Sequence, residues 1–176
     1  MRKMAVVAFS GLLGLVLVGL AVAGANRNYS VHASGDLELP LRDTDAQGQA
    51  IFHLAKDGES IEYKLIVANI ENVFQAHIHM AASTANGPIV VWLYPSTAPV
   101  PVPLDQAQGR IEGVIAEGTI TAANLVGPLA GHDLDDLLAA LDSGNAYVNA
   151  HTNDNVAPTN TGPGDFPGGE IRGNFG

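Results

Sequence analysis

A period of two in the large apolar side chains over residues 61–67 constrains the fold more than any other feature of the chain. Every second position carries a large apolar side chain: Ile61, Tyr63, Leu65 and Val67. Because successive side chains of a β-strand point to opposite faces, this period of two predicts an antiparallel strand with one buried face. The Asp57-Gly58 dipeptide just before it is typical of a hairpin turn.

Other segments with related patterns predict the remaining strands. They are 36–41, 50–55, 73–80, 89–93, 111–121, 146–152 and 168–173. Pro40 makes the first of these an edge strand, because proline cannot donate a hydrogen bond within a sheet. Residues 95–103 hold four prolines and predict a stiff, exposed loop.

One segment, 133–143, has the pattern of a helix. Its leucines recur at intervals of three and four residues, which gives a single apolar stripe. Aspartates fill the first turn, and Gly144 is a typical residue after a helix end. We therefore predict an all-β fold, an antiparallel β-sandwich with Greek-key-like connections and one short helix in a connection.

Residues 1–25 have the pattern of a secretory signal peptide. Arg2 and Lys3 precede an apolar run over 4–22, and small residues at 21–25 offer a cleavage site. The run is also long enough for an uncleaved membrane anchor, although its glycines and terminal small residues favour cleavage. We expect residues 26–35 to form an N-terminal tether and 36–176 to form the domain. The expected location is secreted, extracellular or in the cell envelope, with no membrane contact beyond the signal segment.

Charge and cysteine content restrict the partners and the source of stability. Without residues 1–25 the chain has 6 basic and 18 acidic side chains, a net charge of −12. This balance excludes nucleic acid as a partner, since phosphate binding needs basic side chains, and it is compatible with metal ions. The chain has no cysteine, so an exported form depends on its hydrophobic core without disulfides.

Three histidines in two predicted strands indicate a metal site. His77 and His79 are two positions apart and share one face of their strand, while the residues between and beside them are small or apolar. His151 lies in a second strand of similar pattern. Neutral imidazoles suit copper or zinc, and three of them are enough for a site with an open position. His53 is a candidate fourth ligand.

Other polar residues are candidates for support of this site. Asn149 or Glu170 can orient His151 if their strands are neighbours. Arg172 is expected to pair with Glu170 or to cap a backbone carbonyl. His32 and His132 are expected to be exposed or structural.

An ordered series of short motifs resembles a known family. The motifs are Asp57-Gly58 with Tyr63-x-Leu65-x-Val67, Ala76-His77-Ile78-His79, Gly87-Pro88-Ile89-Val90-Val91, Gly118-Thr119-Ile120-Thr121, Leu125-Val126-Gly127-Pro128-Leu129, 144–152 and 169–173. Together they resemble the CHRD domain, named after chordin, over about Val31 to Phe175. The resemblance implies an extracellular protein without an established biochemical activity. Because the cysteine-rich modules of chordin are missing, growth-factor inhibition does not carry over.

The histidine pattern also resembles copper–zinc superoxide dismutases, which place a His-x-His pair on one strand and add a histidine from a later strand. His77, His79 and His151 match those three copper ligands. The bridging histidine, the zinc-site cluster and the cysteine pair of those enzymes have no counterpart. The resemblance therefore implies a mononuclear site and does not imply dismutase activity.

Two functions follow from these observations. The first is a secreted or envelope protein that binds copper or zinc through His77, His79 and His151. The second is a non-enzymatic interaction or matrix module, in which loops such as 95–103 contact an extracellular protein or cell-surface component. The chain has no nucleophile–base motif and is not expected to be an enzyme; if it is one, a copper-dependent redox activity is expected. Convergence of the three rings on one point distinguishes the first function from the second.

Overall fold

The computed structural model describes residues 27–95 and 109–176, and within them the chain forms one antiparallel sheet of eight strands. The order along the sheet is β5-β4-β7-β8-β1-β2-β3-β6. The strands are β1 (Asn28–Ser34), β2 (Gln47–Leu54), β3 (Ile61–Glu71), β4 (Val73–His79), β5 (Ile89–Tyr94), β6 (Arg110–Ile120), β7 (Tyr147–Thr152) and β8 (Ile171–Asn174). The helical elements are the 3-10 turns η1 (Gly35–Leu37), η2 (Ala122–Asn124) and η3 (Gly127–Leu129), and the α-helix α1 (Leu134–Asp142).

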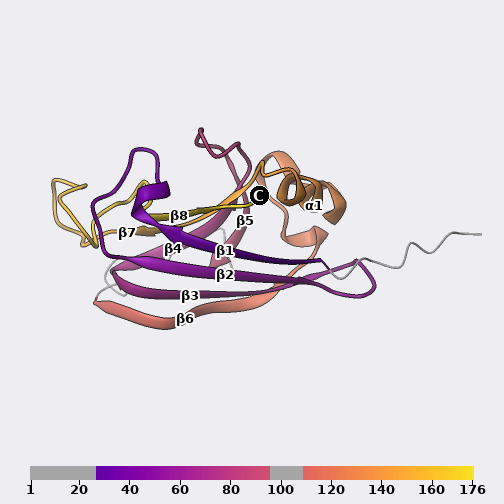
Figure 1. Cartoon of the computed structure of the whole chain (residues 1–176), viewed down its shortest axis with the longest axis horizontal. Helices are drawn as coiled ribbons and strands as arrows, with labels where there is room; N and C mark the ends of the chain where they lie inside the picture. The colour runs from indigo at the N-terminus through magenta and orange to yellow at the C-terminus, as the bar shows by residue number, and fades with distance from the viewer. Residues whose placement is uncertain (1–26, 96–108) are drawn as a thin grey trace, which may run out of the picture.

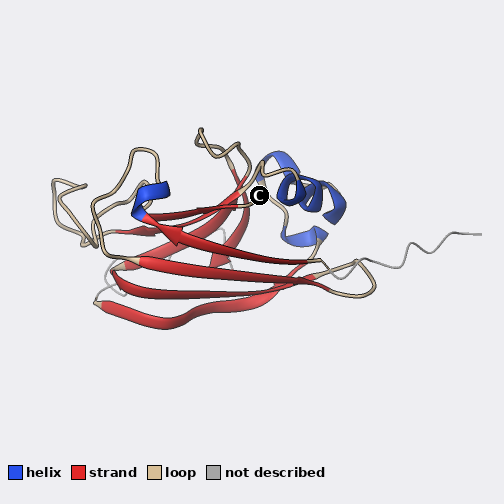
Figure 2. Cartoon of the chain, viewed as in Figure 1, coloured by secondary structure: helices blue, strands red, loops and turns tan. Residues whose placement is uncertain are grey.

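This sheet folds over itself into two layers, β5-β4-β7-β8 and β1-β2-β3-β6 (Figures 1 and 2). The layers are joined between β8 and β1, where the register pairs Ser34 with Arg172. Near the other edge, the Tyr63 hydroxyl of β3 donates a 2.8 Å hydrogen bond to the Leu93 carbonyl of β5. The predicted all-β class and the antiparallel β-sandwich are confirmed.

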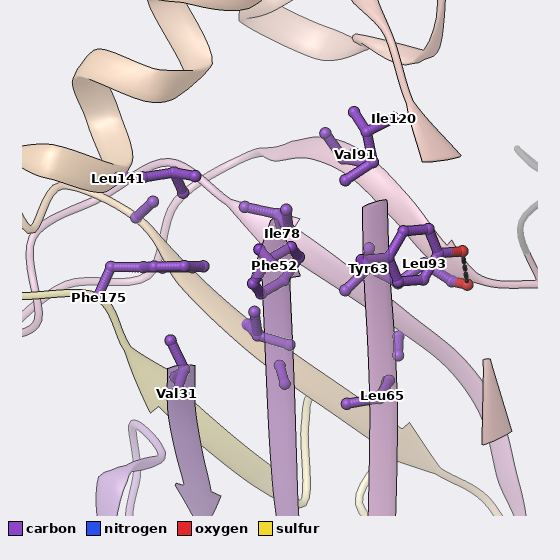
Figure 3. Close-up of a cluster of buried hydrophobic side chains, with 14 of the residues drawn as sticks. Val31, Phe52, Tyr63, Leu65, Ile78, Val91, Leu93, Ile120, Leu141 and Phe175 are labelled. Carbon is purple, nitrogen blue, oxygen red and sulfur yellow. Dashed lines mark hydrogen bonds between the residues drawn. The ribbon is translucent and has the colours of Figure 1, made fainter. Parts of the chain in front are cut away.

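Apolar side chains from the inner faces of both layers form the core. Figure 3 shows Phe52 and Leu65 from one layer and Ile78 from the other turned into the same space. Phe175, after β8, contacts Phe52 at 5.4 Å between ring centroids. Each large apolar side chain buried in this way stabilises the fold by about 1.5–3 kcal/mol. The alternation over residues 61–67 is confirmed, because all four apolar members are buried.

The α-helix α1 lies in the connection between β6 and β7, as the sequence predicts. It begins after Asp133, and two further aspartates in its first turn lie where the helix dipole favours negative charge. All four leucines of its stripe are buried. The helix itself lies at one end of the sandwich (Figure 2). Gly144 follows the helix with a φ of +69°, a left-handed conformation that glycine adopts without strain.

Two segments near the start of the domain differ from the predictions. The expected tether, residues 26–35, contains β1, which lies inside the sheet between β8 and β2. Its Val31 and Ala33 alternate with polar residues, but they are too few and too small to stand out as a strand signal. The expected edge strand over 36–41 is wrong, since that segment holds η1 and a loop and leaves Leu41 69% exposed.

The predicted signal peptide, residues 1–25, and nearly all of the proline-rich segment 95–103 lie outside the described residues. Among the residues that are described, no helix has the length and apolar character needed to cross a membrane.

Candidate metal centre

Pairing of β4 with β7 places the predicted ligands on neighbouring strands. The antiparallel register sets His77 opposite Asn149 and Gln75 opposite His151. Because side chains alternate along each strand, the histidines and Asn149 point away from the core, while Ile78 between them points into it. One face of this strand pair therefore belongs to the core and the other carries the imidazoles.

Three loops cover the histidine face. The loop over 35–46 contributes Glu38, the loop over 80–88 contributes the Gly87 carbonyl, and the loop over 153–170 contributes the Pro167 carbonyl. Figure 1 shows the first of these loops (indigo) and the last (yellow) at the same end of the molecule, away from α1. As a result the outer face of β4 and β7 is buried: His77 is 0%, His79 7% and His151 6% exposed.

The three rings converge. One possible ligand atom from each of His77, His79 and His151 lies within 4.8 Å of the others. Within this group His77 Nδ1 and His151 Nε2 are 3.2 Å apart. A point centred between three atoms 4.8 Å apart lies about 2.8 Å from each, so bonds of about 2.0–2.1 Å require the rings to move inward by less than about 1 Å. This group of three can therefore hold a metal ion.

Backbone carbonyls fix the orientation of two of the rings. The Nδ1–H group of His79 donates to the Gly87 carbonyl at 2.8 Å, and that of His151 donates to the Pro167 carbonyl at 2.9 Å. Because a carbonyl only accepts, these bonds select the tautomer in which Nε2 carries the lone pair. Metal-binding histidines are usually held in this way, with the second ring nitrogen donating to a carbonyl or carboxylate.

Two ring nitrogens in the cluster have no hydrogen-bond partner within the described part of the chain. They are Nε2 of His77 and Nε2 of His79, and both are buried. A buried polar atom without a partner costs about 1–3 kcal/mol. A bound metal ion would use the Nε2 lone pair of His79, whereas His77 would bind through Nδ1, which faces His151 Nε2 at 3.2 Å. The residues present therefore fit the ligand set of a copper or zinc site.

Burial keeps the histidines in their neutral, ligand-competent form. Desolvation, reinforced by the neighbouring rings of His151 and His79, lowers the pKa of His77 to about 2. Desolvation also lowers the pKa of His151 to about 4, although its bond to the Pro167 carbonyl acts in the opposite direction. The pKa of His79 is likewise lowered by burial, against contacts with Gly87 and Asn149 that raise it. None of these three rings carries a proton charge at neutral pH.

Aromatic rings surround the cluster. Trp92 of β5 meets His77 edge to face at 4.3 Å between centroids, and Tyr147 stacks on His79 at 4.7 Å with an interplanar angle of 6°. The Arg172 guanidinium lies 3.5 Å from the centre of the Tyr147 ring. These contacts restrict the rotation of the rings and exclude water from them.

The three other polar residues predicted to support the site differ in whether they contact the histidines. Asn149 Oδ1 lies 3.0 Å from His151 Nε2. Arg172 donates to the carbonyls of Ala82 and Ala85 in the 80–88 loop, so it caps carbonyls and does not pair with Glu170. The Glu170 carboxylate accepts hydrogen bonds from Thr44, Thr152 and the Gly164 amide. It holds two of the covering loops in place and does not contact the His151 ring through any of these bonds.

The remaining histidines lie outside the cluster. His53 is exposed on β2, and its Nδ1 forms a 2.7 Å hydrogen bond with Asn28 Oδ1, so the expectation of a fourth ligand from His53 is wrong. His32 is exposed on β1, and His132 forms a 2.8 Å contact with Asp136 at the start of α1.

Sequence reasoning missed one side chain at this site. Glu38, in a loop and 2% exposed, accepts a hydrogen bond from Asn149 Nδ2 at 3.4 Å, and burial raises the pKa of Glu38. Nothing in the sequence around Glu38 marks it. Tyr147 shares a strand face with Asn149 and His151, as the spacing of two predicts, and its ring stacks on His79.

Comparison with known proteins gives a family and no close relative. The model of a family described as the CHRD domain matches residues 29–159, most of the predicted span of 31–175. No curated protein and no solved structure matches the chain.

Proposed function

Because the chain belongs to the CHRD domain family, we propose that it is an exported, extracellular or envelope-associated protein that binds one copper or zinc ion through His77, His79 and His151. The family is of an extracellular type, and the basic and apolar pattern of residues 1–25 supports export. The absence of cysteine means that export would add no disulfide to the domain.

One observation carries the metal-binding part of this proposal. Three neutral imidazoles from two neighbouring strands meet in a buried space, and the buried Nε2 atom of His79 has no partner among the described residues. A histidine that serves only the fold would be expected to use both ring nitrogens or to expose the unused one to water. The backbone bonds to Nδ1 of His79 and His151 support the same function, because they present Nε2 to the shared space.

Titration of the purified protein with copper and with zinc tests the proposal. We expect one equivalent of metal to bind to the wild-type protein and the His77→Ala/His79→Ala variant to lose that binding. The His53→Ala variant is the matched control, since it removes an imidazole from an exposed strand position outside the cluster. Equal and weak binding by all three proteins would reject the metal site and would favour the interaction module.

A further inference from the structure

We propose that Asn149 binds the metal directly through its Oδ1 atom and completes a closed site of four protein ligands. This inference rests on the metal-binding function proposed above. It identifies the fourth ligand and predicts that no coordination position stays open.

The contact with Glu38 sets the orientation of the Asn149 amide. The side chain is 3% exposed, and its Nδ2 donates to the buried carboxylate of Glu38 at 3.4 Å. Since a carboxylate accepts and an amide oxygen cannot donate, this contact turns Nδ2 towards Glu38 and Oδ1 towards the histidines. The Glu38 carboxylate is itself held by the backbone amide of Leu39 at 3.2 Å.

This orientation brings two acceptor atoms together. His151 donates through Nδ1 to the Pro167 carbonyl, so its Nε2 carries a lone pair, and Asn149 Oδ1 lies only 3.0 Å from that nitrogen. In the metal-free protein His77 Nδ1–H donates to the Nε2 lone pair of His151 at 3.2 Å, but Asn149 Oδ1 offers it no second donor, so these two acceptor atoms still repel one another. A cation bound by both atoms turns this unfavourable contact into two coordination bonds.

The spacing of the atoms matches a coordination sphere. Ligand atoms on a tetrahedral metal with bonds of about 2.0–2.1 Å are about 3.3 Å apart. His151 Nε2 lies 3.0 Å from Asn149 Oδ1 and 3.2 Å from His77 Nδ1. His79 adds the remaining nitrogen from within the same group. Three nitrogens and one oxygen then surround one point.

A site of this kind differs in function from a three-histidine site with an open position. Four-coordinate sites made entirely of protein ligands are typical of structural metals, whereas catalytic zinc sites keep one position for water or substrate. The rings here are almost fully buried, and loops cover them. We therefore infer that the metal stabilises the sandwich and does not activate a substrate.

The closing experiment uses cobalt(II) as a spectroscopic probe of the site and azide as a test of an open position. We expect the visible spectrum of the cobalt-loaded wild-type protein to be that of a tetrahedral ion and to be unchanged by azide. The Asn149→Ala variant should bind cobalt at least about tenfold more weakly, and azide should change its spectrum, because the lost ligand leaves a position open. The Asn149→Asp variant, which keeps an oxygen, should bind cobalt and remain insensitive to azide.

The Gln75→Ala variant is the matched control, since it removes an amide from the same face of β4 outside the ligand group. It should behave as the wild-type protein does. An azide response in the wild-type protein itself, or equal cobalt affinity in the wild-type and Asn149→Ala proteins, would overturn the four-ligand site while leaving the metal-binding function intact. If the wild-type protein binds none of cobalt, copper and zinc, both proposals are wrong.

Discussion

The outer faces of the two layers are built from the same strand pattern and differ in what covers them. On β2 and β3, polar side chains such as His53, Glu62 and Lys64 alternate with core residues and point into solvent. On β4 and β7, His77 and Asn149 alternate with core residues in the same way, yet loops bury them. Strand periodicity thus determines which side chains share a face, and the loops determine whether that face is exposed to solvent or buried.

This difference changes the chemistry of one residue type. His53 and His77 both follow an apolar residue that faces the core. His53 is exposed and bonds to Asn28, while His77 is fully buried beside two other imidazoles. Burial removes the proton from the ring and leaves a lone pair for a metal. The predictions below test whether the covering loops produce this contrast.

The largest effect of a single substitution on stability is expected at Glu170, which attaches the covering loops. Its buried carboxylate accepts hydrogen bonds from Thr44, Thr152 and the Gly164 amide, at 2.6, 2.6 and 2.9 Å. The Glu170→Ala variant leaves these donors without an acceptor, so we expect a loss of about 3 kcal/mol in the free energy of unfolding. The Glu62→Ala variant, on the exposed face of β3, should change it by less than about 0.5 kcal/mol. Urea denaturation of both variants measures the contrast.

Metal affinity gives a second measurement on the same variants. The loop that Glu170 anchors also carries the Pro167 carbonyl that orients His151. We expect the Glu170→Ala variant to bind copper or zinc about 10–100-fold more weakly, the usual effect of losing a residue that orients a ligand. Unchanged stability and affinity in this variant would mean that the loops do not depend on Glu170.

The pH dependence of stability should be a further large effect in the metal-free protein. In the unfolded chain each histidine gains a proton below about pH 6.5, whereas burial holds the pKa of His151 at about 4 and that of His77 at about 2 in the fold. The unfolded state therefore binds more protons, and stability falls as the pH drops from about 6.5. Each of the two rings contributes up to about 1.4 kcal/mol per pH unit to this loss of stability. Below about pH 4 only His77 continues to contribute.

Glu38 changes the stability in the opposite direction as the pH falls. Burial raises the pKa of Glu38, so the folded state holds that proton at a higher pH than the unfolded chain and gains stability on acidification. Urea midpoints measured from pH 8 to pH 4 give the net slope. The slope of stability against pH should be smaller in the His77→Ala variant by the contribution of about one histidine. The slope of the His53→Ala variant should equal that of the wild-type protein. An identical slope in the wild-type and His77→Ala proteins would contradict the buried, neutral state of His77.

Much of the fold was predictable from sequence, because local patterns determined it. The alternation over 61–67, the Asp57-Gly58 hairpin and the leucine stripe of α1 each predict an element that the structure contains. β1 was missed because small and polar side chains weaken its pattern. The pairing of β4 with β7 was also inaccessible to local patterns, since about seventy residues separate the two strands and register depends on the whole sheet.

The candidate site was predictable only in part, for the same physical reason. The shared face of His77 and His79 follows from strand geometry alone. Their approach to His151 depends on strand order, and their burial depends on three loops without regular structure. Glu38 and the carbonyls of Gly87 and Pro167 contribute through loop conformation, which leaves no periodic signal. Those are the groups that sequence reasoning did not find.

The smallest effect is expected from the ion pair on the exposed layer. Lys64 Nζ of β3 and Glu117 Oε2 of β6 are 3.3 Å apart, with side chains 47% and 67% exposed. Water screens this pair, so a double-mutant cycle with Lys64→Ala and Glu117→Ala should give a coupling of at most about 0.5 kcal/mol. The coupling should vanish in about 1 M salt, where the screening length is about 3 Å. A coupling above about 1 kcal/mol that persists in salt would show that the outer face of β3 and β6 is shielded as well, and the contrast between the two layers would then not depend on the loops.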